Sequence, residues 1–265
     1  MVNDVKGERI EAVRLHYERG WKSYCISTQC GCGFGCKFCA TGTLGLKRNL
    51  TADEITDQLL YFHLQGHSLD SVSFMGMGEA LANPHIFEAL NLLTDPNLFG
   101  LGHRRITIST IGLLPGIDKL TREYPQVNLT FSLHSPFDDQ RSELMPINDR
   151  YPVSDVLQAL DRHIRQTGRK VYIAYLLLRG VNDSTGHAEA VAELLRGRGP
   201  GERLFHVNLI PYNSTEVTPE SYRTSDAGQI ERFVRTLKSK GVMTTVRTQF
   251  GSDINAACGQ LYDTK

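Results

Sequence analysis

Strand-like and helix-like runs alternate along the chain from Thr51 onward, and this alternation limits the folds that the sequence can adopt. The first helical run begins with a capping box formed by Thr51 and Glu54. Strands that alternate with helices are typical of βαβ units, which build a parallel sheet. About six such units occur, which is too few for a closed eightfold barrel. We therefore predict an α/β fold with a partial (β/α)6 barrel of TIM type, rather than a doubly wound sheet.

The predicted elements follow one another in chain order. Strands are expected at SVSFMG, RITIST, VNLTFSLH, KVYIAYLLL, FHVNLIPYN and VMTTVRT. Helices are expected at ITDQLLYFHL, PHIFEALNLL, 114–123, SDVLQALDRHIRQ, 188–196 and DAGQIERFVRTLKSK. The stretch between His134 and the helix that begins near Ser154 is expected to be irregular.

An N-terminal β-hairpin is expected to precede the barrel. RIEAVRLHY alternates, residues 18–20 can turn, and WKSYCIS is rich in strand formers. Residues 1–27 would form this hairpin and lead into the first barrel strand, and residues 22–265 would form the barrel. No repeat, low-complexity tract or long linker divides the sequence.

Composition narrows the class of protein. Of the 265 residues, 40% are hydrophobic and 22% charged, which is typical of a globular domain. The N-terminus has no signal-peptide pattern, and no apolar run is long enough to cross a membrane, so we expect a cytoplasmic protein whose thiols stay reduced. With 29 basic and 29 acidic residues the net charge is zero, which argues mildly against a nucleic-acid partner.

Five of the six cysteines lie within Cys25–Cys39, and the sixth is Cys258. A structural zinc site usually takes four ligands as two separated pairs. The pair Cys36 and Cys39 has no distant second pair, although Cys30 and Cys32 could contribute. A zinc site therefore remains an alternative.

Cys32, Cys36 and Cys39 have the spacing C-x3-C-x2-C on a segment rich in glycine. Three thiolates on a 4Fe–4S cluster leave one iron without a protein ligand, and that iron is open to another molecule. With Phe38 before the last cysteine, this spacing resembles the signature of the radical S-adenosylmethionine (SAM) superfamily. The resemblance implies a partial β/α barrel, one 4Fe–4S cluster on these three cysteines, and SAM bound at the open iron.

Polar residues reappear at the ends of several predicted strands. In parallel α/β folds the functional face lies at the carboxyl ends of the strands, so these residues are expected to meet there. GMGE follows the strand SVSF, and it resembles the superfamily's methionine-binding segment, in which Glu79 would meet the SAM ammonium group. The predicted SAM-binding residues are Gly78, Glu79, Ser109, Ser132, Leu133, His134 and Asn213.

Three further residues could take part in chemistry. Glu11 shares its predicted strand face with apolar residues, where a carboxylate is unfavourable unless it is partnered or serves as a general base. Cys25 and Cys258 have no place in a cluster held by three thiolates. A buried cysteine is often inert, so residue chemistry alone does not decide whether Cys25 and Cys258 pack in the core or react.

Six blocks together resemble the RlmN/Cfr family of adenine methyltransferases, and the similarity runs from Glu8 to Tyr262. The blocks are CISTQCGCGFGCKFCATG, SFMGMGEALANP, ITISTIG, LTFSLHSP, LMPINDRYP and DINAACGQL. Within the family, QCGC and GMGEAL look like Cfr members, which methylate carbon 8 of an adenosine in the peptidyl transferase centre of 23S rRNA. The resemblance thus implies resistance to ribosome-targeting antibiotics. RlmN members methylate carbon 2.

The resemblance also implies a role for each spare residue except Cys30. Cys258 would take a methyl group from one SAM molecule, and a second SAM would supply a radical that removes hydrogen from it, so that two SAM molecules are used per turnover. The methylene radical would join the adenine and leave an RNA–Cys258 crosslink. Glu11 would take the adenine proton, and Cys25 would release the product by forming a transient disulfide with Cys258.

The same resemblance gives the partners. It implies protein-poor 23S rRNA as substrate, an external electron donor such as flavodoxin, and a monomer that does not bind membranes. The family's N-terminal helical domain is expected to be absent. Carbon 8 rests on resemblance alone, so the alternatives are a carbon-2 enzyme of RlmN type, a radical SAM enzyme with another substrate, and a zinc-dependent RNA-binding module.

Overall fold

An eight-stranded sheet forms the centre of the structure, a computed structural model that describes residues 2–3, 8–17, 20–248 and 260. The strand order is β12-β11-β10-β9-β8-β7-β4-β3. All neighbouring pairs from β4 to β12 are parallel, and only β3 runs antiparallel to its neighbour. The strands are β3 (Val13–His16), β4 (Lys22–Cys25), β7 (Ser71–Phe74), β8 (Ile106–Thr110), β9 (Asn128–Ser132), β10 (Val171–Leu177), β11 (Phe205–Pro211) and β12 (Met243–Val246).

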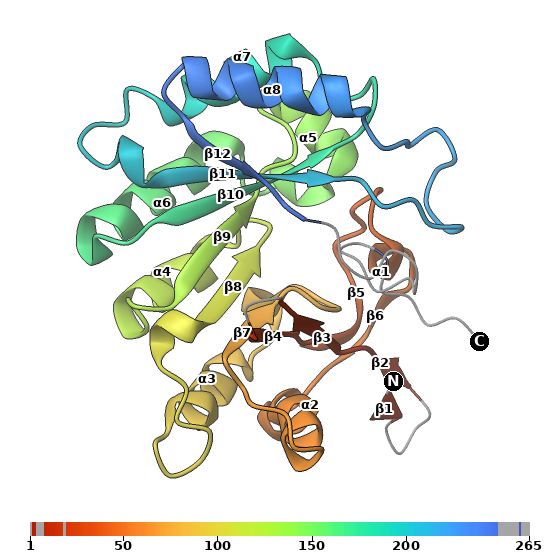
Figure 1. The fold of residues 1–265 in the computed structure, drawn as a ribbon, viewed down its shortest axis with the longest axis vertical. Helices are drawn as coiled ribbons and strands as arrows, with labels where there is room; N and C mark the ends of the chain where they lie inside the picture. Colours follow the sequence, from red (N-terminus) through yellow and green to blue (C-terminus); the bar gives the residue numbers. More distant parts are fainter. Residues whose placement is uncertain (1, 4–7, 18–19, 249–259, 261–265) are drawn as a thin grey trace.

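Six helices each follow one of the parallel strands and pack along the outside of the curled sheet (Figure 1). They are α2 (Ala52–Leu64), α3 (Ile86–Thr94), α4 (Leu114–Glu123), α6 (Val153–Thr167), α7 (Thr185–Leu195) and α8 (Ala227–Ser239). The predicted capping box at Thr51 and Glu54 is present at the start of α2. The partial (β/α)6 barrel is therefore confirmed, with β12 as a seventh parallel strand that ends the series.

The N-terminal hairpin is formed by β3 and β4. The prediction of one continuous strand from Arg9 to Tyr17 is wrong, because β2 (Arg9–Ile10) pairs with β1 (Val2–Asn3) and the chain leaves the strand conformation at Glu11 and Ala12. Residues 18 and 19 of the predicted turn lie outside the described residues. Glu11 therefore does not share a strand face with the apolar residues of β3.

Two segments have regular structure that the sequence did not predict. The cysteine segment begins in a two-stranded ribbon, β5 (Gln29–Cys32) paired with β6 (Gly45–Asn49), and contains the short helix α1 (Ala40–Thr43). The expected irregular stretch after His134 contains α5 (Asp138–Leu144) and the 3-10 turn η3 (Pro146–Asp149). Three other 3-10 turns are η1 (Ala80–Ala82), η2 (His103–Arg105) and η4 (Glu202–Leu204).

The side chains of the central strands alternate between two environments. Ile108, Leu129 and Phe131 are fully buried in the main core, which also contains Leu160 of α6. The intervening polar residues of β8 and β9 lie on the opposite, concave side of the sheet. Apolar packing against the helices thus leaves the concave side available for polar groups. No helix among the described residues is long and apolar enough to span a membrane.

Loss of volume in the central strand β9 should destabilise the whole barrel. Leu129 is completely buried, so Leu129→Ala should lower the free energy of unfolding by about 2–5 kcal/mol, measured by urea denaturation. Leu64, which is 76% exposed at the end of α2, is the control, and Leu64→Ala should change that free energy by less than about 0.5 kcal/mol. Equal effects in the two variants would contradict the placement of the core.

Candidate functional site

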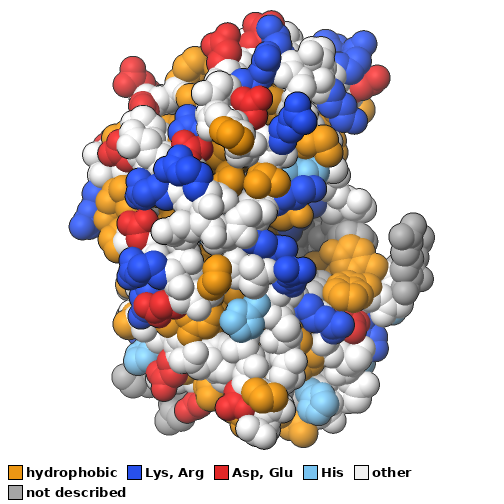
Figure 2. All heavy atoms as spheres, turned by 90° about the vertical axis from the view of Figure 1, so that its left-hand side faces the viewer, with side chains coloured by type: hydrophobic (Ala, Val, Ile, Leu, Met, Phe, Trp, Pro, Cys, Tyr) orange, Lys and Arg blue, Asp and Glu red, His pale blue; other side chains and the backbone are white. Residues whose placement is uncertain are grey.

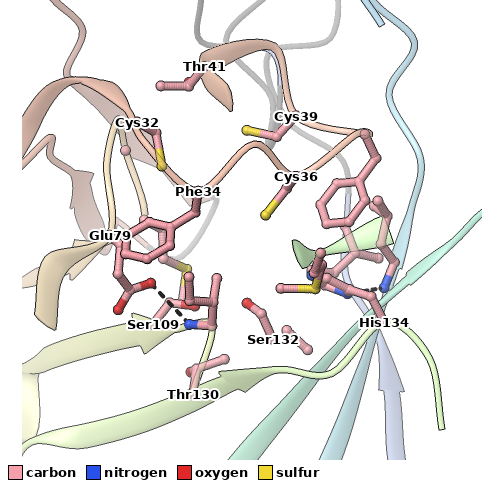
Figure 3. A pocket seen from close by; sticks show the side chains of 18 of the residues that line it. Cys32, Phe34, Cys36, Cys39, Thr41, Glu79, Ser109, Thr130, Ser132 and His134 are labelled. Atoms are coloured by element: carbon pink, nitrogen blue, oxygen red, sulfur yellow. Dashed lines mark hydrogen bonds between the residues drawn. The ribbon is translucent and has the colours of Figure 1, made fainter. Parts of the chain in front are cut away.

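A single pocket at the carboxyl ends of the strands brings together most of the predicted site residues (Figure 3). The cysteine segment lies on one side of the pocket, and the ends of β8 and β9 lie on the other. The predicted residues that line the pocket are Cys32, Cys36, Cys39, Gly78, Glu79, Ser109, Ser132 and His134. The expectation that strand-end polar groups and the cysteines share one face is confirmed.

The local backbone fixes the three cysteines in different ways. Cys32 ends strand β5, and Cys39 is the residue before helix α1. The N–H of Cys39 donates to the carbonyl of Cys36 (3.1 Å). Between them, Lys37 donates its N–H to the carbonyl of Leu144 at the end of α5 (3.0 Å). The glycine-rich cysteine segment therefore consists of a ribbon, a turn and the start of a helix, held by main-chain hydrogen bonds.

The pocket is a poor environment for isolated thiolates. Burial raises the pKa of Cys32 to about 11. Burial also raises the pKa of Cys36, and the nearby Cys39 and Cys32 raise it further, because like charges would repel. A cationic group that binds to these thiols would therefore favour their ionisation.

The donor set fits a 4Fe–4S cluster better than a single ion. The described residues contain no group of three His, Cys, Asp or Glu side chains that could hold one metal ion. A zinc ion gathers its sulfur donors at about 2.3 Å from one centre, whereas a 4Fe–4S cluster takes each thiolate on a different iron. Three thiols spread along one side of a pocket therefore suit the cluster and do not suit the zinc alternative.

Glu79 places a carboxylate in the same pocket. Its Oε2 accepts the N–H of Ile111 (3.0 Å) (Figure 3). Its Oε1 accepts the N–H of Leu81 (3.3 Å). The side chain is only 4% exposed, and burial raises its pKa to about 7, against the opposing effect of a hydrogen bond from Thr110. A buried carboxylate held in this way is suited to bind an ammonium group, since that would supply the missing positive charge.

Two glycines of the segment GMGE are required by packing. Gly78 has φ +96°, and a Cβ there would lie 2.5 Å from the Cβ of Gln29. A Cβ on Gly76 would lie 2.7 Å from the main chain of Ile26. The side chain of Gln29 accepts the N–H of Glu79 (2.9 Å), so this close approach fixes the main chain of Glu79.

His134 is held as a neutral hydrogen-bond donor. Its Nδ1 accepts the N–H of Leu176 (2.9 Å), which leaves the proton on Nε2. Burial lowers its pKa to about 3, and the ring packs edge-on against Phe38 (4.9 Å between centroids). His134 also adopts a left-handed conformation (φ 57°). The imidazole can therefore offer an N–H to a ligand while it supports the cysteine segment.

Two predicted SAM-binding residues do not line the pocket. The Leu133 side chain is fully buried in the main core, and its N–H donates to the carbonyl of Ala174 (3.0 Å). Asn213 follows the end of β11 and is buried, but its neighbour Tyr212 is the residue that lines the pocket. Their roles remain predictions.

Cys25 and Glu11 lie near each other at the first barrel strand. Cys25 ends β4, opposite Val13 of β3, and points away from its buried neighbour Tyr24 toward the concave side of the sheet. The main-chain carbonyl of Glu11 accepts the hydroxyl of Ser27 (2.6 Å), and the same hydroxyl accepts the N–H of Met77 (2.8 Å). Ser27 thus connects the predicted base to the GMGE segment.

The predicted partner of Cys25 is not placed by the structure. Cys258 lies outside the described residues, and no disulfide joins two of the cysteines that the structure describes. Cys30 donates its thiol to the carbonyl of Arg9 (3.2 Å) and is buried away from the pocket. This contact gives Cys30 a packing role between β2 and β5.

Comparisons with known proteins agree with this geometry. The family model of the radical SAM superfamily matches residues 26–195. A protein named "Ribosomal RNA large subunit methyltransferase Cfr" from Lachnoclostridium phytofermentans is 63% identical over 98% of this chain and 75% of its own length. A protein of the same name from Staphylococcus aureus is 63% identical over 97% of this chain and 74% of its own. This chain belongs to the Cfr family within the radical SAM superfamily.

A solved structure supports the same family fold. A radical SAM methyltransferase from Sphaerobacter thermophilus superposes with a TM-score of 0.91 at 43% sequence identity, and the match covers 97% of this chain and 75% of that one. The resemblance to the RlmN/Cfr family is therefore confirmed. The open sheet and its N-terminal hairpin are the fold in which this Cfr-family chain builds its pocket.

Sequence reasoning missed several residues that line the pocket of this Cfr-family chain. Thr130 and Asn208 lie on the concave side of β9 and β11, and Arg247 follows β12. Strand alternation could have found Thr130, which lies two residues before the predicted Ser132. Arg247 had no such signal, because its place depends on how β12 pairs with β11.

The three assigned cysteines should be necessary for the cluster. Cys36→Ala should reduce iron and sulfide to background after anaerobic reconstitution, because only two thiolates would remain to hold the cluster. Cys30→Ala is the matched control, since this thiol lies in the same segment but outside the pocket, and it should keep the iron content of the unmodified chain. Unchanged iron in Cys36→Ala, or zinc without sulfide in the unmodified chain, would contradict the assignment.

Proposed function

We propose that this chain is a radical SAM methyltransferase that methylates carbon 8 of an adenosine in the peptidyl transferase centre of 23S rRNA. One observation carries the proposal. Cys32, Cys36 and Cys39 face Glu79 across a single pocket in a chain that is 63% identical to proteins named for rRNA methylation. The rRNA substrate comes from the names of those relatives, and carbon 8 comes from the resemblance to Cfr members.

The pocket residues divide into two groups in this proposal. Cys32, Cys36 and Cys39 would hold the 4Fe–4S cluster, and the Glu79 carboxylate would accept hydrogen bonds from the SAM ammonium group. Gly78, Ser109, Ser132 and His134 would complete the SAM site, with the neutral His134 donating from Nε2. When bound, the cluster supplies the single electron that cleaves SAM and yields a radical able to remove hydrogen.

The other residues would handle the methyl group and the RNA. Carbon 8 of adenine is a poor nucleophile, so the Cys258 thiolate would first take a methyl group from the SAM sulfonium. Glu11 would later accept the adenine proton. Gln260 donates its side-chain amide to the carbonyl of Ser214 (3.1 Å), two residues after the pocket-lining Tyr212.

Product release would depend on Cys25. Its thiolate would attack the Cys258 sulfur, so that a sulfur–sulfur bond forms while the carbon–sulfur bond to the RNA breaks. The electron pair of the broken bond would leave with the modified adenine, which takes up a proton to complete the methyl group. The position of Cys25 on the concave side of β4, close to Glu11, supports this assignment.

The proposal includes several partners. The substrate would be protein-poor 23S rRNA, the electron would come from an external donor such as flavodoxin, and the chain would act as a cytoplasmic monomer. Methylation in the peptidyl transferase centre would confer resistance to antibiotics that bind there.

The site of methylation is the decisive test. Mass spectrometry of 23S rRNA from cells that express the chain should locate one added methyl group on carbon 8 of a single adenosine in the peptidyl transferase centre. Cells that express Cys258→Ala are the control and should lack this group, because the methyl-accepting thiol is gone. A methyl group on carbon 2 would indicate an RlmN-type enzyme, and unmodified rRNA would refute the proposal.

A second prediction tests the release step. Cys25→Ala should still form the covalent bond to RNA but should fail to break it, so the variant should accumulate with RNA attached, visible as a band shift on denaturing gels. The double variant Cys25→Ala, Cys258→Ala should show no adduct, and Cys30→Ala should turn over without trapping RNA. Full turnover by Cys25→Ala would refute the release role. If Cys25 only packs in the core, the substitution should lower the free energy of unfolding by about 1 kcal/mol and leave the reaction intact.

A further inference from the structure

A buried arginine on α5 has no part in the chemistry proposed above. Arg141 is 0% exposed, which is unusual because a charged group is unfavourable in the interior unless its donors are bonded. Its guanidinium lies 5.1 Å from the centre of the Phe131 ring. A fully buried arginine is therefore expected to have a specific structural or functional role.

The guanidinium binds the ends of two strands that form the pocket. Nη2 donates to the carbonyls of Ile111 (2.8 Å) and Ser132 (3.0 Å), and Nε donates to the carbonyl of Leu133 (3.0 Å). Ile111 follows β8, and Ser132 ends β9, so one planar group fixes the spacing of these two strand ends. Ile111 is also the residue whose N–H holds the Glu79 carboxylate, and both Ile111 and Ser132 line the pocket.

The remaining contacts connect this group to the segment after α5. Nη1 donates to Oδ1 of Asn148 in η3 (2.8 Å). The amide nitrogen of Asn148 donates in turn to Oδ1 of Asp138 (3.0 Å) and to the hydroxyl of Ser142 (3.1 Å) on α5. Arg141 and Asn148 thus hold α5 and η3 as one unit against the strand ends.

The far end of the same unit holds the cysteine segment. The carbonyl of Leu144 accepts the N–H of Lys37, which lies between Cys36 and Cys39 (3.0 Å). Leu144 and Met145 also pack in one apolar cluster with Phe38, and Cys36 and Cys39 pack against that cluster. A single unit of α5 and η3 therefore touches both sides of the pocket.

The charged guanidinium of Arg141 is held by neutral hydrogen-bond acceptors. Among the described residues no carboxylate lies within ion-pair distance of its guanidinium, whose bonds go to neutral oxygens. Burial lowers its pKa to about 10, and the nearby Cys36 and Asp138 favour its charged form.

We propose that Arg141 is a positioning residue that fixes the cysteine segment relative to the SAM-binding ends of β8 and β9. It acts through the carbonyls of Ile111, Ser132 and Leu133 on one side, and through α5 and the Leu144–Lys37 hydrogen bond on the other. The distance between the cluster and SAM would thus be set by this arginine. The inference rests on the proposed cluster and SAM site.

The test compares Arg141→Lys with Arg198→Lys. Lysine keeps the charge of Arg141 but cannot reach its separate acceptors from one nitrogen, so the reconstituted variant should bind SAM at least about tenfold more weakly in equilibrium dialysis. In the cluster-free protein, the Lys37 amide should exchange with deuterium at least about tenfold faster. Arg198, which forms a part-buried ion pair with Asp161 (2.6 Å), is the matched control, and its variant should leave both measurements within about twofold.

A second variant keeps the test decisive if Arg141→Lys does not fold. Asn148→Ala leaves three guanidinium hydrogen bonds in place and removes the side-chain hydrogen bonds that join Asn148 to Arg141, Asp138 and Ser142. It should therefore shift both measurements in the same direction by a smaller factor. SAM affinity and Lys37 exchange that match the unmodified chain in every folded variant would overturn the proposal, even if the melting temperature falls. Failure of the unmodified chain to bind a cluster would instead refute the proposed function, and exchange at Lys37 in the cluster-free protein would still decide the role of Arg141.

Discussion

Parallel hydrogen bonding between neighbouring strands is the constraint on which the site depends. Because the strands from β4 to β12 all run in one direction, their carboxyl ends lie at one edge of the sheet, on the same side as the cysteine ribbon (Figure 1). The register places Ser109 opposite Thr130, and Ser132 opposite Ala174, so that residues far apart in sequence line one pocket. Antiparallel pairing of any one of these strands would move its end to the opposite side of the molecule.

Periodicity predicted much of this arrangement because it depends on local pattern. The sequence predicts Ser109, Ser132 and His134 as site residues because each lies at the end of a predicted strand, and the common direction of the strands then brings these ends together. The same reasoning failed at Glu11, because alternation of residue types does not reveal that a strand has been interrupted. It also failed for α5, whose seven residues are too few for a clear helical period. Arg141 could not be found from sequence, since its acceptors are main-chain carbonyls on other elements.

The electrostatics of the pocket connect its assembly to the cofactors. Burial raises the pKa values of Cys32, Cys36 and Glu79 and so favours their neutral forms. A cluster that binds thiolates and a ligand that carries an ammonium group would each supply the positive charge that these anions need. The pocket is therefore suited to positively charged groups on both sides, and the neutral His134 adds an N–H donor that needs no counter-charge. Cluster binding should accordingly be tied to loss of protons from the thiols.

Net charge is a sum over the whole sequence and does not reveal where the charges lie. The amino ends of β10, β11 and β12 gather on the opposite face, where a hollow is lined by Lys170, Arg203, Lys240 and Arg196 together with Glu202. The Glu202 carboxylate accepts a hydrogen bond from the N–H of Gly197 (2.8 Å). The four basic side chains form no ion pair with the carboxylates that the structure describes. Figure 2 shows this face, with a band of Lys and Arg side chains across it. Equal numbers of acids and bases in the sequence thus coexist with a local excess of positive charge. A total of zero does not argue against a polyanionic substrate, because electrostatic attraction depends on where charges lie.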